Sequence, residues 1–215
     1  MSINKLKREE LLLYGVISKG DLSLEKYLEK IKQSIDAGVT ILQLREKNID
    51  TESFIELGNK VKKITDKMGI KLIINDNIEV CKKINCEGVH IGQGDISPKE
   101  ARKILGEYKI IGLSIQTREH LEKSISSDVD YYGIGAVFST KTKLDADNVS
   151  YSDLKALSLD SKIPVVAIGG INKSNILELE DTGIAGVAIV SAIYGVEDTY
   201  KESKVLSDLA KKIIF

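Results

Sequence analysis

The sequence predicts an α/β fold, and within that class a single (β/α)8 TIM barrel with parallel strands. Eight short apolar, β-branched runs recur along the 215 residues and alternate with helical patterns. The runs are apolar throughout rather than alternating, as expected for parallel strands covered on both faces. Only two prolines occur and no linker-like composition interrupts the chain. We therefore expect one barrel domain over residues 1–215.

The eight expected strands follow one another at regular spacing. In order they are Leu11–Ile17, Val39–Leu44, Lys71–Ile74, Gly88–Ile91, Lys109–Leu113, Tyr131–Ile134, Pro164–Ile168 and Gly186–Val190. An open doubly wound sheet is the alternative arrangement. It gains no support from motifs, because Gly133-Ile134-Gly135 lacks the third glycine of a dinucleotide fingerprint and no Walker-type P-loop occurs.

Helical periodicity fills the segments between these strands, for example over residues 24–35 and 54–64. Helix starts are expected at Asp50, at Ser97, which forms a capping box with Glu100, and at Thr117. Glycine and asparagine precede several strands and suit helix C-caps: Gly38, Gly69, Asn85 and Gly183.

Polar side chains collect after the strands, whereas plain turns precede them. Because a barrel carries its site at the carboxyl ends of its strands, we expect the functional groups there. Composition excludes some other functions. The net charge is −1, Trp is absent and aromatic residues make up 5%, which argues against a nucleic-acid partner. No apolar run approaches 18 residues, so we expect no membrane partner.

Localisation is expected to be cytoplasmic. The N-terminus lacks an apolar signal region. The two cysteines, Cys81 and Cys86, fit a reducing compartment, and their C-x4-C spacing is not a usual zinc spacing. Whether the protein forms a homo-oligomer is left open, because nothing in the sequence decides the oligomeric state.

Anion-binding chemistry is expected after the sixth, seventh and eighth strands. Phe138 to Lys143 read Phe-Ser-Thr-Lys-Thr-Lys, which offers hydroxyl and ammonium donors and no apolar face. Gly169-Gly170 allows close approach of backbone N–H groups, and Ser191 begins a short helical turn. In barrels, the loops after strands 7 and 8 commonly bind a phosphate. The alternatives are a solvated loop and a tight turn.

Two acids, Asp76 and Asp95, follow the third and fourth strands, which are neighbours in a barrel. Such a carboxylate pair favours a Mg²⁺ site, although each acid alone would fit a helix cap or a turn. Strand alternation points Gln43, Arg45 and Lys47 to one side, where they could bind a phosphate or a polar heterocycle.

The two histidines contribute less to the predicted chemistry. His90 is expected to line the pocket or to fill the barrel, and His120 to lie on a helix surface. Neither has a visible Ser or Cys partner for nucleophilic catalysis.

Several motifs together resemble the thiamine-phosphate synthase family. They are Gly-Val-Thr-Ile-Leu-Gln-Leu-Arg-Glu-Lys (38–47), Ile-Ile-Asn-Asp (73–76), Gly-Val-His-Ile-Gly-Gln-Gly-Asp (88–95), Gly-Leu-Ser (112–114), Thr-Lys-Thr-Lys (140–143), Ala-Ile-Gly-Gly-Ile (167–171) and Val-Ser-Ala-Ile (190–193). The resemblance implies a transferase that joins a phosphorylated pyrimidine to a phosphorylated thiazole, giving thiamine phosphate and diphosphate.

The resemblance also implies roles for individual residues. Asp76 and Asp95 would bind Mg²⁺. The pyrimidine diphosphate would contact Gln43, Arg45, Lys47, Asn75, Ser114 and Lys143, of which Arg45, Ser114 and Lys143 are expected to be catalytic. The thiazole phosphate would contact Thr140, Thr142, Gly170, Val190 and Ser191.

The sequence departs from the family pattern at three positions. Asn77 replaces a usual Arg, Gly94 replaces a common acid, and Ser139 stands where Pro is common. Two other functions are weighed. A related thiazole tautomerase is expected to carry His where this chain has Gln116, and a non-catalytic phosphate-ligand sensor would bind ligand without releasing diphosphate.

Overall fold

The computed structural model describes residues 5–125, 127–139 and 149–215. Its eight strands form one closed barrel in which every neighbouring pair is parallel and β1 closes the ring against β8. The strands are β1 (Leu13–Ile17), β2 (Ile41–Leu44), β3 (Lys71–Asn75), β4 (Gly88–Ile91), β5 (Ile110–Ile115), β6 (Tyr131–Ile134), β7 (Val165–Ile168) and β8 (Gly186–Ile189). The predicted (β/α)8 barrel is therefore confirmed.

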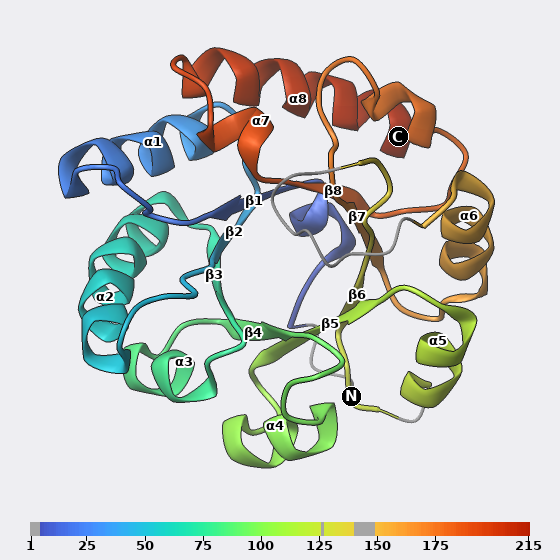
Figure 1. The fold of residues 1–215 in the computed structure, drawn as a ribbon, viewed down its shortest axis with the longest axis horizontal. Coiled ribbons are helices and arrows are strands. Elements are labelled where there is room, and N and C mark those ends of the chain that lie inside the picture. Colours follow the sequence, from blue (N-terminus) through green and yellow to red (C-terminus); the bar gives the residue numbers. More distant parts are fainter. Residues whose placement is uncertain (1–4, 126, 140–148) are drawn as a thin grey trace.

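Helices surround the ring of strands (Figure 1). They are α1 (Leu24–Asp36), α2 (Thr51–Met68), α3 (Ile78–Ile84), α4 (Pro98–Leu105), α5 (Arg118–Ser124), α6 (Tyr151–Asp160), η2 (Ile176–Leu179), α7 (Ser191–Tyr194) and α8 (Thr199–Ile214). The 3-10 helix η1 (Arg8–Leu11) instead lies at the amino end of the barrel. No helix within these described ranges has the length and hydrophobicity of a membrane span.

The local signals in the sequence place most helix ends correctly. Asp50, Ser97 and Thr117 each accept a backbone N–H and cap α2, α4 and α5. Gly69 and Asn85 adopt the left-handed conformation that ends α2 and α3. Two details differ from the prediction: Ala37, not Gly38, occupies the C-cap of α1, and Gly183 follows the 3-10 helix η2 rather than an α-helix.

Buried apolar residues form two clusters, one on each face of the sheet. The larger packs the outer faces of the strands against the helices. The smaller fills the barrel interior and contains Leu11, Tyr14, Val16, Ile41, Ile73, Ile110, Tyr131, Val166, Ala185 and Ala188. This double burial explains why the strands read as unbroken apolar runs.

The amino end of the barrel is closed by η1. Leu11, expected as the first residue of a strand, instead ends η1 and is fully buried in the interior cluster. Arg8 Nη2 donates to the carbonyl oxygens of Gly183 and Ile184 over 3.0 and 2.7 Å. With this end filled, the carboxyl ends of the strands are left as the face that can hold a ligand.

Candidate active site

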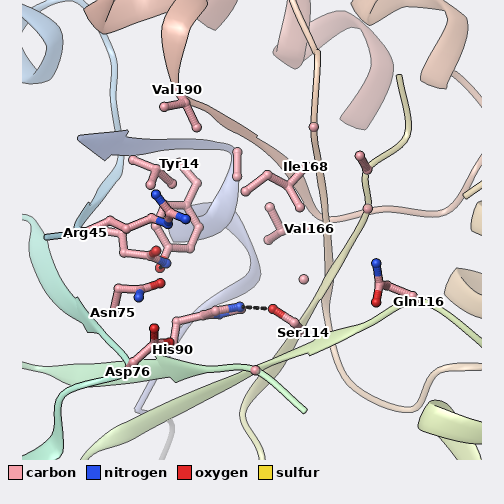
Figure 2. A pocket seen from close by; sticks show the side chains of 18 of the residues that line it. Tyr14, Arg45, Asn75, Asp76, His90, Ser114, Gln116, Val166, Ile168 and Val190 are labelled. Carbon is pink, nitrogen blue, oxygen red and sulfur yellow. Dashed lines mark hydrogen bonds between the residues drawn. The ribbon is translucent and has the colours of Figure 1, made fainter. Parts of the chain in front are cut away.

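A cavity of about 400 Å³ lies at the carboxyl ends of the strands and extends into the barrel interior. It is lined by every predicted site residue that the structure describes: Gln43, Arg45, Lys47, Asn75, Asp76, Asp95, Ser114, Gly170, Val190 and Ser191. Figure 2 shows side chains from β2, β3, β4 and β5 converging on this space. Thr140, Thr142 and Lys143 lie outside the described residues.

The two acids lie side by side at the edge of this cavity. Burial, followed by the neighbouring carboxylate of Asp95, raises the pKa of Asp76 to about 6, while Lys47 opposes the rise. Asp76 adopts φ 60°, and its N–H donates to the carbonyl oxygen of His90 over 2.9 Å. Asp95 Oδ2 accepts the N–H of Gly92 over 2.7 Å. A half-buried carboxylate beside a second, exposed one forms an electrostatic site that favours a cation.

Among the residues that the structure describes, this carboxylate pair has no third acidic, histidine or cysteine ligand. Within residues 5–125, 127–139 and 149–215, no group of three or more such side chains could hold a metal ion. A cation bound here would have to complete its coordination with other oxygens. Water and substrate phosphates commonly supply them to Mg²⁺.

The basic residues extend from β2 on the side that strand alternation predicts. Arg45 and Lys47 line the cavity, whereas Glu46 does not. Glu46 Oε1 instead accepts the N–H of Lys19 over 2.6 Å, and burial raises the pKa of its carboxyl. Ser18 Oγ donates to the carbonyl oxygen of Arg45. Through these two hydrogen bonds, the loop after β1 fixes the position of the loop after β2, which carries Arg45 and Lys47.

The backbone at Gly170 is held tightly by its neighbours. Gly170 has φ 65°, and a Cβ built on it would lie 2.6 Å from the carbonyl oxygen of Ser139. Its own carbonyl accepts the side-chain amides of Asn172 and Asn175 over 3.1 and 3.0 Å. Asn175 was not predicted, although Asn-x-x-Asn directly after the paired glycines was a usable signal. Both the conformation and the space at this position require glycine.

Ser114 lies deeper than expected. It was predicted to follow the fifth strand, but β5 continues to Ile115 and includes it. Its side chain therefore projects from within the sheet towards the barrel interior, opposite His90 (Figure 2).

His90 does have a serine neighbour, which the sequence did not reveal when neither histidine was given a Ser or Cys partner for nucleophilic catalysis. His90 Nε2 lies 2.9 Å from Ser114 Oγ (Figure 2), and His90 Nδ1 lies 3.0 Å from Tyr131 Oη. Twenty-four residues separate the pair in sequence, and only the β4–β5 register brings them together. Because Nδ1 faces a phenol and not a carboxylate, the arrangement is not a Ser-His-Asp triad. His120 does lie on α5, where its Nδ1 accepts the N–H of Gln116.

Comparison with known proteins gives a consistent result. A family model described as thiamine monophosphate synthase matches residues 13–193. The thiamine-phosphate synthase of Clostridium tetani is 41% identical over 94% of this chain and 96% of its own length. That of Methanobrevibacter smithii is 45% identical over 86% of this chain and 88% of its own length.

Solved structures agree with the sequence relatives. A thiamine phosphate pyrophosphorylase from Pyrococcus furiosus superposes with a TM-score of 0.88 at 31% identity, covering 97% of this chain and 99% of that one. A geranylgeranylglyceryl phosphate synthase from Thermoplasma acidophilum superposes with a TM-score of 0.70 at 12% identity, covering 99% of this chain and 100% of that one. The second likeness shows the barrel fold alone.

Proposed function

Because this chain belongs to the thiamine monophosphate synthase family and is a transferase, we propose the two substrates that its cavity joins. The first is 4-amino-2-methyl-5-(diphosphooxymethyl)pyrimidine. The second is 4-methyl-5-(2-phosphooxyethyl)thiazole or its carboxylated form. The products are thiamine phosphate and diphosphate.

The observation that carries this proposal is the division of the cavity into two chemical halves. Its mouth holds two cations, two carboxylates and paired glycines, which suit phosphate groups with a metal ion. Its inner part is lined by Tyr14, Val166 and neutral hydrogen-bonding groups such as Ser114. An aromatic heterocycle carrying a diphosphate matches this combination of an apolar interior and a charged mouth.

The carboxylate pair fits Mg²⁺. Asp76 and Asp95 would hold the ion, because hard carboxylate oxygens are the ligands it prefers. Burial and then the neighbouring Asp95 carboxylate raise the pKa of Asp76, and a cation between the two acids would offset both effects. When bound, Mg²⁺ would neutralise diphosphate oxygens and so favour departure of that group.

The remaining steps follow from the protein's own groups. Arg45 and Lys47 would bind the diphosphate and stabilise the negative charge that grows on it as the C–O bond breaks. The aminopyrimidine would be left as a carbocation, which the thiazole nitrogen then attacks. Placing that nitrogen against the cation supplies much of the acceleration, so no strong general base is needed.

The thiazole phosphate is assigned to the loops after β7 and β8. Backbone N–H groups near Gly170, with Ser191 at the start of α7, would donate to its phosphate oxygens. Thr140 and Thr142 are proposed as further donors. Lys143 is proposed to contact the pyrimidine diphosphate and to stabilise the negative charge that develops on it as the C–O bond breaks.

One incubation separates this proposal from its rivals. The protein is mixed with both substrates and Mg²⁺, and thiamine phosphate and diphosphate are quantified over time. We expect them in equal amounts. A tautomerase would instead isomerise the carboxylated thiazole, which Gln116 in the cavity lining argues against. A sensor would bind substrate without releasing diphosphate, and either of these results would refute the proposal.

A further inference from the structure

Five polar side chains form a continuous hydrogen-bonded line across the barrel, here called the interior network: Gln43, Tyr14, Tyr131, His90 and Ser114. Gln43 Nε2 donates to Tyr14 Oη over 3.0 Å, and Tyr14 Oη lies 2.8 Å from Tyr131 Oη. Tyr131 Oη lies 3.0 Å from His90 Nδ1, and His90 Nε2 lies 2.9 Å from Ser114 Oγ. The two ends of this line, Gln43 and Ser114, both lie in the cavity wall.

The two tyrosines in the middle of the interior network are buried, although both lie in the cavity wall. Tyr14 and Tyr131 are each 1% exposed, and burial is the largest cause that raises the pKa of both phenols. The phenols therefore stay neutral, with one proton each. The two phenol oxygens already hydrogen-bond to each other and to Gln43 and His90, so the ends of the line, Gln43 and Ser114, are the groups left to offer a further hydrogen-bonding atom to a ligand.

Two glycines provide the space for this line. A Cβ on Gly112 would lie 2.4 Å from Tyr131 Oη and 2.5 Å from His90 Nδ1, and one on Gly133 would lie 2.9 Å from His90 Cε1. Strand register places Gly112 between His90 on β4 and Tyr131 on β6. The interior network is therefore built into the sheet and does not depend on loop positions.

Counting protons gives the line a direction. Gln43 Nε2 can only donate, so Tyr14 accepts from it and is left to donate to Tyr131. Tyr131 then donates to His90 Nδ1, and the second ring nitrogen, Nε2–H, donates to Ser114. The hydroxyl proton of Ser114 is not used within the network, so it faces the cavity and can be donated to a ligand.

The opposite direction leaves a proton stranded. If Ser114 donated to His90, the phenol proton of Tyr14 would have no acceptor within residues 5–125, 127–139 and 149–215. An unpaired buried donor of this kind lowers the population of that arrangement by on the order of 10-fold to 100-fold. The reverse order is satisfied only if the Gln43 amide turns and offers its oxygen to Tyr14.

We propose that Tyr14, Tyr131 and His90 are positioning residues that couple the hydrogen-bonding polarity of Gln43 to that of Ser114. When the side-chain oxygen of Gln43 faces the cavity as an acceptor, the Ser114 hydroxyl faces it as a donor. The two residues can exchange these roles only together. The cavity is thereby fitted to a ligand edge that pairs one donor with one acceptor. The edge of an aminopyrimidine, with an N–H of the amino group beside a ring nitrogen, has this pattern. The choice of ligand rests on the proposed function, whereas the proton order does not.

The tautomer of His90 tests the proton order without any substrate. The chain has two histidines, so a His120→Gln background labelled with ¹⁵N-histidine reports His90 alone. At pH 8 we expect a proton on Nε2 and none on Nδ1. In Tyr131→Phe the Nδ1 partner is lost, and the signals should move towards a mixture of both tautomers. Tyr14→Phe should produce a weaker shift in the same direction.

The neighbouring residue supplies the matched control. Tyr132 lies on the same strand, is also buried, and its hydroxyl accepts from Ser124 outside the interior network. Tyr132→Phe removes the same atom and should leave the His90 spectrum unchanged. A proton on Nδ1 in the wild type, or no response to Tyr131→Phe, would overturn the proton order.

Kinetics test the coupling. We expect Tyr131→Phe to lower kcat/KM for the pyrimidine diphosphate by about 10-fold, with the KM for thiazole phosphate unchanged within about 2-fold. In a Ser114→Ala background, Tyr131→Phe should lower kcat/KM for the pyrimidine diphosphate by less than 10-fold, because the network acts partly through Ser114. Fully multiplicative losses, or equal effects on both substrates, would contradict the coupling. If the wild type forms no thiamine phosphate, the proposed function fails and the tautomer result still decides the proton order.

Discussion

The two ends of the barrel use charge in opposite ways. At the amino end, charges are paired: Asp130 contacts Lys5 at 3.0 Å and Arg102 at 2.8 Å, and Lys71 pairs with Glu10. At the carboxyl end, Arg45 and Lys47 form no ion pair within 4 Å of any described residue. Asp76 stands beside a like charge, Asp95, at the same end. The first arrangement stabilises the fold, and the second keeps charge available for a ligand.

Sequence composition alone does not reveal this difference, since both ends are rich in Lys, Arg, Asp and Glu. What separates them is whether a charge has a partner. Substitutions at the amino end should therefore change stability and spare turnover. Substitutions at the carboxyl end should mainly lower turnover or substrate affinity, with smaller effects on stability.

The largest expected effect is on turnover at the carboxyl end. Asp76→Asn should lower kcat by on the order of 10³-fold, because it removes a charge proposed to hold the metal. Asparagine tolerates the positive φ of Asp76 better than alanine, so the backbone should be retained. Initial rates across a Mg²⁺ titration measure the loss. If the wild-type protein kept its turnover in the presence of EDTA, the proposed metal requirement would be wrong.

At the amino end we expect a loss of stability instead. Arg102→Met should lower the free energy of unfolding by about 3 kcal/mol, since the largely buried Asp130 loses one of its two ion-pair partners. Arg102 also donates to the carbonyl oxygens of Gly106 and Asp128 over 2.9 and 3.1 Å. Urea unfolding gives the stability, and kcat should stay within about 2-fold of the wild type at 25 °C. A large drop in kcat of the folded variant would break the comparison.

Two glycines with the same backbone conformation give a smaller, matched contrast. Gly170 and Gly69 have φ 65° and 71°, but a Cβ on Gly69 meets nothing within 4 Å. Gly69→Ala should lose about 1 kcal/mol of stability from left-handed strain. Gly170→Ala should lose more, because its Cβ would also lie 2.6 Å from the carbonyl oxygen of Ser139. Only Gly170→Ala should also raise the KM for thiazole phosphate, by about 10-fold, because its backbone would shift. Equal KM values for the two variants would argue against a phosphate at Gly170.

The smallest effect concerns pH. The pKa of Asp76 is raised to about 6, so the metal-free folded protein holds this proton more tightly than the unfolded chain does. Stability should therefore fall as pH rises from about 4 to about 6 and level off above. Because the carboxyl is only half-buried, we expect about 1 kcal/mol. Metal-free Asp76→Asn should lack this slope, and an unchanged slope would reassign the titration to another group.

Much of the fold was predictable because continuous apolar runs are distinctive of parallel strands. All eight strands were located, two of them with the observed bounds and six with errors of one or two residues at one or both ends. The 3-10 helices η1 and η2 were not foreseen, since four-residue turns carry too little periodicity to be seen. Leu11 looked like strand because it is as apolar as its neighbours in β1.

The site was predictable where polar residues end a strand. Arg45, Asp76 and Gly170 break an apolar run and are conspicuous for that reason. Tyr14 and Tyr131 were missed because buried tyrosines look like core residues in a sequence. Only the closed barrel shows that Tyr131 points inwards, to the cavity, while Tyr132 points outwards, to the helices.

The most direct test of the account measures stability and turnover together in metal-free Asp76→Asn at pH 7.5. We predict that its free energy of unfolding exceeds that of the metal-free wild type, because the repulsion with Asp95 is gone, while turnover after Mg²⁺ addition collapses. An Asp76→Asn protein that is less stable than the wild type, or that keeps wild-type turnover, would contradict the claim that this charge is held unpaired for a ligand.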